Sequence, residues 1–146
     1  MAALTAPTAA SVKPSSSGLG SIQRGVALEA ITIGFPIYIA TDGTIGLANA
    51  NTAATAVLAT MAGVALNSCA TGQYVFYCSS DTAFVHGFTA SEIKAGEFVY
   101  LDDVAGGYTV TGSDLSIGDY ICYIGQINNP ETTMNLAPKT PILHAT

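Results

Sequence analysis

Several residue types that often mark a binding or catalytic site are scarce in this chain. It contains no tryptophan, and only 10 % of its residues are charged, against roughly 25 % in an average soluble domain. The four basic residues are scattered: Lys13, Arg24, Lys94 and Lys139. A groove that follows a phosphate backbone needs clustered cations, as does docking to an anionic membrane. We therefore expect neither a nucleic-acid partner nor a membrane partner.

Cysteine is also sparse and does not form a recognisable pattern. The three cysteines are Cys69, Cys78 and Cys122, and no C-x-x-C spacing occurs. An odd number at these spacings argues against a disulfide framework and against a structural zinc site. We expect buried free thiols, with a Cys69–Cys78 disulfide across a hairpin as the alternative.

Long apolar runs are missing as well. The densest apolar segment, residues 53–66, has 14 residues and is interrupted by threonine and glycine, whereas a membrane-spanning helix needs about 20. The first twelve residues lack the basic start and the sustained apolar stretch of a secretory signal. We expect no membrane span and no signal peptide.

Catalytic motifs are absent too. The chain has no G-x-S-x-G elbow, no phosphate-binding loop and no H-E-x-x-H. A small hydrolase built on His86 is the residual enzyme hypothesis, and nothing near His86 suggests a nucleophile or an orienting acid. Asp42, Asp102 and Asp103 supply too few oxygens for calcium, which needs about six, and we expect them to be solvated turn carboxylates. The sequence thus predicts no enzyme, no metal and no cofactor.

The chain does contain an internal repeat. The segment ITIGFPIYIATDGTIGLANA starts at Ile31, and IKAGEFVYLDDVAGGYTVTG starts at Ile93. The matched pairs are all 62 positions apart: Ile31 and Ile93, Gly34 and Gly96, Ile37 and Val99, Tyr38 and Tyr100, Ile39 and Leu101, and Gly63 and Gly125. Such a repeat is typical of a scaffold made from two similar β units.

The local patterns predict short strands separated by Gly-rich turns. Val26, Leu28 and Ile31 are the candidates to point inward from a first strand over 22–31. Asp42-Gly43 should form a hairpin turn. Further strands are expected over 31–40, 44–50, 59–66, 73–80, 82–87, 97–103 and 119–129, with short helical turns near 51–58 and 89–92. Neither unit is large enough to bury its own core, so we predict an all-β fold, a small antiparallel β-barrel or sandwich.

Composition divides the chain into three parts. Residues 1–20 are rich in Ala, Ser, Thr and Pro and should form an extended N-terminal arm, disordered alone or ordered against a partner. Residues 21–134 should form the β body, with repeats at about 26–72 and 88–134. Residues 135–146 should form a C-terminal tail.

The first repeat resembles a known family. The segment GVALEAITIGFPIYIATDGTIGLANANTAATAVLATMAGVALNSCATGQ is similar to the tailed-phage capsid cement, or head decoration, proteins, and the likeness covers roughly residues 24–130. The matching positions are Gly34, Ile37, Tyr38, Asp42, Gly43, Leu47, Ala48, Ala62, Gly63, Val64, Ala65, Leu66, Gly72 and Gln73. KAGEFVYLDD and YIGQI extend the likeness into the second repeat. The chain departs from the family at Asn49 and Asn51, where an acidic residue is common.

The resemblance implies a structural role. Such proteins bind the outside of an expanded icosahedral head and strengthen it, with no active site. The implied partner is the major capsid protein, self-association on the shell is expected with a trimer as one arrangement, and the implied location is the outer capsid of the virion after assembly in the host cytoplasm. We expect the arm and the first strand to contact the shell, through six candidates: Val12, Lys13, Pro14, Leu19, Ile22 and Arg24.

A second function stays open at this point. The chain could be a β-barrel adhesion or carbohydrate-binding module of a phage tail or fibre, because aromatic side chains stack on sugars. The aromatic residues that motivate this reading are Tyr74, Phe76, Tyr77, Phe84 and Phe88.

Overall fold

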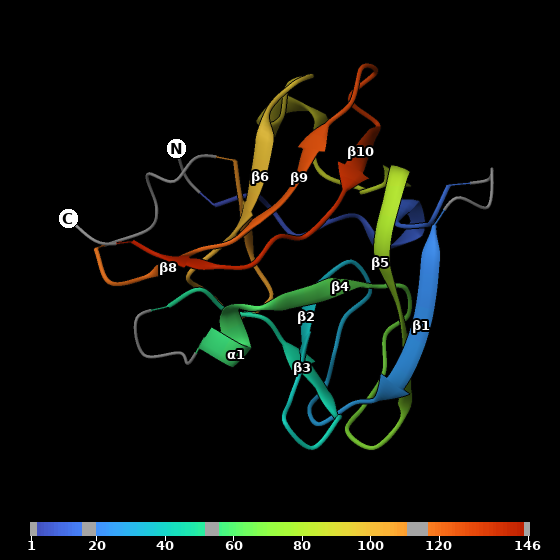
Figure 1. The fold of residues 1–146 in the computed structure, drawn as a ribbon. Helices are drawn as coiled ribbons and strands as arrows, with labels where there is room; N and C mark the ends of the chain where they lie inside the picture. Colours follow the sequence, from blue (N-terminus) through green and yellow to red (C-terminus); the bar gives the residue numbers. More distant parts are fainter. Residues whose placement is uncertain (1–2, 16–19, 52–55, 111–116, 145–146) are drawn as a thin grey trace.

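The computed structural model describes residues 3–15, 20–51, 56–110 and 117–144, and these form a mainly β fold (Figure 1). The strands are β1 (Ser21–Val26), β2 (Pro36–Ile39), β3 (Ile45–Leu47), β4 (Met61–Ala65), β5 (Tyr74–Val85), β6 (Phe98–Leu101), β7 (Tyr108–Thr109), β8 (Tyr120–Ile121), β9 (Tyr123–Ile127), β10 (Thr133–Leu136) and β11 (Ile142–Leu143). One helical turn, α1 (Ala56–Ala59), precedes β4, and 3₁₀ turns cover Ala9–Ser11 and Ala90–Glu92.

Nine of these strands form one curled antiparallel sheet. Its order is β3-β2-β4-β5-β10-β9-β6-β7, and β1 pairs with β5 beside this path. The strands β8 and β11 form a separate pair. The sheet curls into a half-barrel, which confirms the predicted all-β class.

The two predicted units are present and are built alike. Figure 1 shows β6, β9 and β10 above β2, β3 and β4, with β5 running between the two groups. Ile37 lies opposite Gly63, and Val99 lies opposite Gly125. In both units the register shifts at the next residue, a tyrosine: Tyr38 pairs with Met61 and Tyr100 with Tyr123. The repeat in the sequence is therefore a repeat in strand pairing.

The repeated glycines have a steric cause. A Cβ atom at Gly63 would collide with the carbonyl oxygen of Cys78, and one at Gly125 would collide with that of Asn135. In each unit, the backbone of the neighbouring strand occupies the space that a side chain would need. Only glycine lets the two backbones approach so closely.

The long strand β5 differs from the prediction of two shorter strands. It runs unbroken for 12 residues. Its first half pairs with β4 and its second half with β10, so β5 joins the units. Val75 and Tyr77 are buried, and the next residue, Cys78, is buried too. The alternation of inward and outward residues breaks there because β5 changes partner strand.

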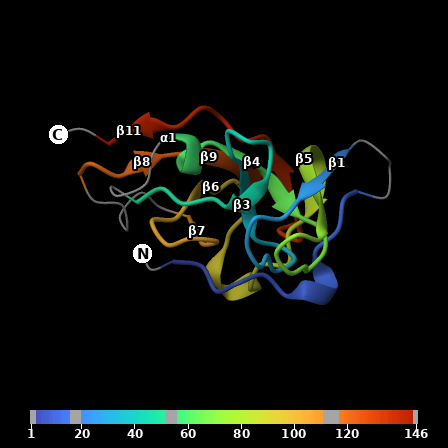
Figure 2. The same ribbon diagram turned by 90° about the horizontal axis from the view of Figure 1, so that it is seen from below.

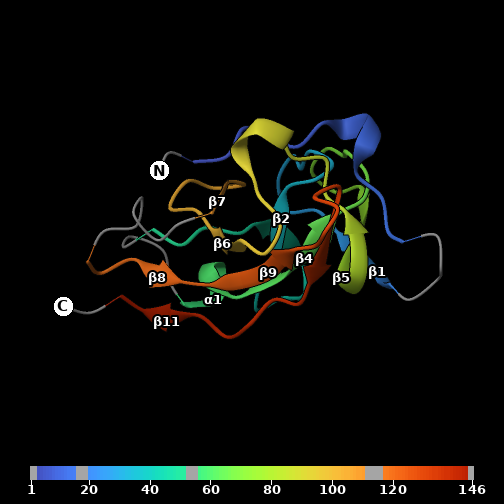
Figure 3. The same cartoon turned by 90° about the horizontal axis from the view of Figure 1, so that it is seen from above.

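The N-terminal arm lies against its own β body. Leu4 and Val12 are buried, at 8 % and 6 % exposure, and belong to the larger core cluster. The Thr8 N–H donates to the carbonyl of Gly87 at 2.8 Å, and the backbones of Lys13 and Val85 form an isolated antiparallel β-bridge. Figures 2 and 3 show the arm running beside the 3₁₀ turn at 90–92. The side chain of Val12 is therefore part of this protein's own core.

The C-terminal segment also takes part in the fold. Strand β10 crosses the predicted start of the tail, and Leu136 is fully buried. Strand β11 pairs with β8, as Figure 3 shows. The expected tail thus contains the end of β10 and all of β11, which its low apolar content did not suggest.

Candidate functional site

His86, the residue that motivated the hydrolase hypothesis, has a structural role. It is 4 % exposed, and its Nδ1 accepts the N–H of Phe88 at 2.9 Å. Because Nδ1 is an acceptor, the ring proton is on Nε2, which lies 2.5 Å from the carbonyl oxygen of Glu131. Burial lowers the pKa of His86 below its ordinary value of 6.5. Both ring nitrogens are used by the backbone, so neither serves as a free base.

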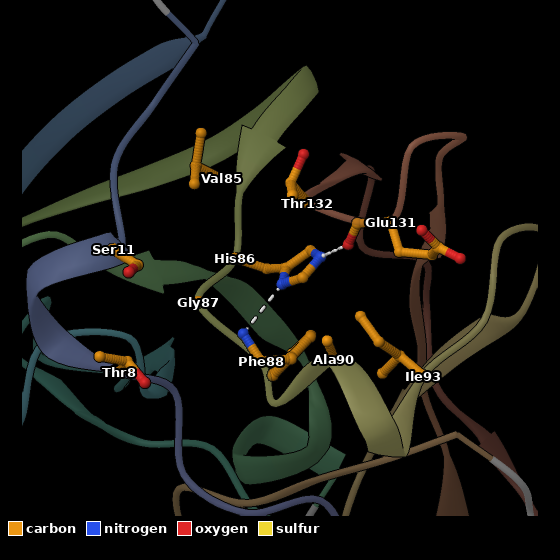
Figure 4. A pocket seen from close by; sticks show the side chains of 10 residues that line it. All are labelled: Thr8, Ser11, Val85, His86, Gly87, Phe88, Ala90, Ile93, Glu131 and Thr132. Carbon is orange, nitrogen blue, oxygen red and sulfur yellow. Dashed lines mark hydrogen bonds between the residues drawn. The ribbon is translucent and has the colours of Figure 1, made fainter.

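A pocket of about 270 Å³ lies beside His86 (Figure 4). Phe88 and Ile93 supply apolar walls, while Thr8 and Ser11 bring hydroxyl groups from the arm. The carboxylate of Glu131 points away from the imidazole in Figure 4. The pocket therefore lacks the coupled nucleophile, base and acid that a hydrolase needs.

The carboxylates that suggested calcium do not converge. Within the residues that the structure describes, no three His, Cys, Asp or Glu side chains gather where they could hold a metal ion. Asp42 is exposed in its hairpin, and hydrogen bonds from the hydroxyl and N–H of Thr44 lower its pKa. Asp102 is 2 % exposed, so the expectation of a solvated turn carboxylate is wrong there.

Two of the three thiols are buried as expected, and the third is only partly buried. All three cysteines are free, which excludes the alternative of a Cys69–Cys78 disulfide. Cys78 and Cys122 are fully buried, and Cys69 is half-buried. Burial, with a smaller contribution from the charge of Asp81, raises the pKa of Cys78 to about 11. A thiol with such a pKa is a poor nucleophile at neutral pH.

Strand β1 presents apolar residues outward, opposite to the prediction. Val26 and Leu28 were expected to face the core, but they are 39 % and 37 % exposed. Ile31 is buried as expected, and Ala27 is buried instead of Val26 and Leu28, at 2 % exposure each. The sequence did not indicate that Ala27 faces inward, because its side chain is small and a hydrophobic pattern favours the larger residues as the inward-facing set.

These outward residues join aromatic residues of β5 in one exposed surface. Arg24 lies directly opposite Phe76, and Val26 directly opposite Tyr74, so their side chains share a face. We call this surface the β1–β5 face, and its members are Ile22, Arg24, Val26, Tyr74 and Phe76. The exposed fractions are 51 % for Ile22, 56 % for Tyr74 and 44 % for Phe76. Monomeric proteins seldom leave such adjacent apolar groups uncovered.

Arg24 supplies the one positive charge of the β1–β5 face. Its guanidinium carbon lies 4.6 Å from the centre of the Tyr74 ring, in a cation–π contact. Among the described residues, no carboxylate pairs with Arg24. The chain carries a net charge of −6, so this cation stands out on an acidic molecule.

The six predicted contact residues do not form a single surface. Ile22 and Arg24 lie on the β1–β5 face. Val12 is buried, Lys13 is exposed and Pro14 is half-buried. Leu19 lies outside the described residues. Sequence reasoning had assigned Tyr74 and Phe76 only to the adhesion hypothesis, because nothing in the sequence showed that β5 would be the neighbour of β1.

Comparison with known proteins adds no relative. No protein-family model and no curated protein matches this chain. Within the described ranges, no helix is both long and apolar enough to cross a membrane.

Proposed function

We propose that this protein is a structural capsid cement protein, which binds the outer surface of a phage head and stabilises the shell. The sequence resemblance supports this proposal, and so does the curled β fold made of two like units. The proposed partner is the major capsid protein, and the proposed location is the outer face of the virion. The protein acts by binding and not by catalysis.

The observation that carries the proposal is the β1–β5 face. Ile22, Tyr74 and Phe76 are each more than two-fifths exposed and lie together at the margin of the sheet. Aromatic residues and arginine are enriched where proteins bind other proteins. The β1–β5 face has this composition, with Arg24 among apolar neighbours.

A modest surface is enough for this role. One face of about five side chains gives weak binding for a single copy. Many copies on one shell, or several in one oligomer, add through multivalency. Each bound copy that spans neighbouring capsid subunits opposes their separation, which is how a shell would resist internal pressure.

The test is binding to expanded capsids that lack this protein. We expect saturable co-sedimentation of the wild type and clearly weaker binding of Phe76→Ser. Phe98→Ser is the matched control, because Phe98 is similarly exposed, at 47 %, but lies on β6 in the other unit. If Phe76→Ser bound capsids as strongly as Phe98→Ser, the β1–β5 face would not be the attachment surface. If the wild type did not bind, the proposed function would be refuted.

The adhesion alternative loses much of its support. Of the five aromatic residues that motivated it, Tyr77, Phe84 and Phe88 are buried. Tyr74 and Phe76 still form an exposed platform of the kind on which a sugar ring stacks. A glycan screen that returned a ligand, together with no binding to capsids, would favour this alternative.

A further inference from the structure

The hydrogen bonds at the end of β1 determine which of its backbone groups face outward. The Ala27 N–H donates to Gln73 on the β5 side at 2.9 Å, and the Leu28 N–H donates to Ile45 on the other side at 2.8 Å. Successive residues of an antiparallel strand alternate in this way. The N–H and C=O groups of Gln23 and Gly25 therefore face β5, and those of Ile22 and Arg24 face away from it.

The outer edge of β1 at Ile22 and Arg24 has no neighbour among the described residues. Strand β1 pairs with β5 alone, and Figure 1 shows it at the margin of the sheet. The bridge from Ala27 to Ile45 closes this edge only at its C-terminal end. Two residues thus offer two donors and two acceptors in strand geometry, next to the side chains of the β1–β5 face. An unpaired edge of this kind accepts an added strand.

We propose, on the basis of the proposed function, that an extended segment of the major capsid protein adds as a strand to the outer edge of β1. Its backbone pairs with Ile22 and Arg24. Its apolar side chains cover Ile22 and Phe76, and a carboxylate on it faces Arg24. We expect a carboxylate on the added strand because the guanidinium of Arg24 pairs with no carboxylate among the described residues. A carboxylate could bind this guanidinium in bidentate geometry.

A second copy of this chain is a poorer occupant of the same edge. Pairing β1 with β1 of a second copy in antiparallel fashion places Arg24 opposite its own equivalent or diagonally across from it. Both positions are within reach of a long side chain, and like charges there are unfavourable. A strand with a carboxylate at that position removes the repulsion and adds an attraction.

Two substitutions at one position separate backbone pairing from charge. Arg24→Gln removes the charge and keeps the N–H, whereas Arg24→Pro removes both. Proline is tolerated on an edge strand where the N–H faces solvent, so both variants should unfold at the same temperature. On expanded capsids that lack the protein, we expect Arg24→Pro to bind about tenfold more weakly than Arg24→Gln, because the added strand loses a donor for a buried carbonyl.

Hydrogen exchange on the wild type gives an independent readout that needs no variant. When the protein binds capsids, exchange at the Ile22 and Arg24 amides should slow by about tenfold or more, because they gain hydrogen bonds. The Gln23 and Gly25 amides already bond to β5 and should change little. This alternation is the signature of an added strand, whereas simple coverage of the face slows all four amides alike.

The outcomes distinguish this inference from the function on which it rests. Capsid binding that is equal for Arg24→Pro and Arg24→Gln, or uniform slowing of exchange along β1, would overturn strand addition and leave the cement function intact. Absence of wild-type binding would overturn both. A dimer of the free protein that Arg24→Pro abolishes would overturn the proposal in favour of a second copy at the edge.

Discussion

At Gly63 and Gly125, single residues decide how closely two strands approach. Each glycine faces the carbonyl oxygen of an adjacent strand, Cys78 in the first unit and Asn135 in the second. The equivalent positions in the two units meet the same steric limit. At these two positions the packing of the strands depends on the absence of a side chain.

Gly63→Ala and Gly125→Ala should each destabilise the protein by about 2 kcal/mol, since the added methyl group forces the strands apart. Urea denaturation measures the change. Gly43→Ala is the comparison, because its φ is +87° but a Cβ there meets nothing within 4 Å. We expect that variant to lose only about 1 kcal/mol, from backbone strain alone. A larger loss at Gly43 than at Gly63 would contradict the steric explanation.

His86 makes stability depend on pH in a defined direction. Its pKa is lowered in the folded protein and is about 6.5 in the unfolded chain. Above about 6.5 the ring is neutral in both states. As the pH falls from 6.5 toward the lowered pKa, the unfolded state binds the proton first, so stability decreases. A protonated ring could not accept the Phe88 N–H.

His86→Asn should flatten this pH dependence, because the asparagine Oδ1 can accept the Phe88 N–H and does not titrate. Thermal unfolding of both proteins between pH 7.5 and 5 is the measurement. The wild type should lose more melting temperature than His86→Asn over that range. Parallel pH profiles would show that a group other than His86 is responsible.

At the scale of elements, the N-terminal arm is the segment whose place in the structure differs most from the prediction. Leu4 and Val12 fill the core, and Glu92 accepts hydrogen bonds from the backbone and hydroxyl of Thr5 at 3.0 Å each. The carboxylate of Asp81 accepts the Ser15 N–H at 2.6 Å. The arm runs across both units and helps to hold them together. Its removal would damage the fold, so deletion cannot test its contact with a shell.

Val12→Ala should lower the free energy of unfolding by about 2 kcal/mol, because a buried side chain loses its contacts. Lys13→Ala is the control at the next position, where the side chain is exposed, and it should change stability by less than about 0.5 kcal/mol. Chemical denaturation of both variants gives the comparison. Equal stabilities would show that the arm is not part of the core.

The strand pattern and the repeat were predictable from sequence because both depend on short-range signals. Hairpin glycines and the spacing of 62 residues located β2, β4, β6 and β9. The inward set of β1 was not predictable, since Ala27 carries little hydrophobic signal. Burial of the arm was not predictable either, because Leu4 and Val12 are isolated in a segment of small residues, and Tyr108, which bonds to Leu4, is distant in the sequence.

The same distinction applies to the candidate site. Ile22 and Arg24 were predicted as contacts from the position of β1 beside the arm. That Tyr74 and Phe76 would complete their surface depends on the pairing of β1 with β5. Such pairing is a long-range event that a single sequence does not encode locally.

At the scale of the whole molecule, residues of both units contribute to the larger core cluster, and β1 pairs with β5 alone among the described strands. Both ring nitrogens of the buried His86 form hydrogen bonds with the backbone of the same chain. Four of the exposed large apolar side chains, those of Ile22, Val26, Tyr74 and Phe76, lie together on the β1–β5 face. This arrangement is suited to binding a large partner, and we propose, on the basis of the resemblance to cement proteins, that the partner is a capsid.

The most direct test of the cement function is the temperature at which expanded, DNA-filled heads burst, measured with increasing occupancy by this protein. The account predicts that the bursting temperature rises with occupancy and levels off when the sites are full. It also predicts a smaller rise for Phe76→Ser at the same added concentration. A bursting temperature that stays unchanged at saturating occupancy would contradict the central claim.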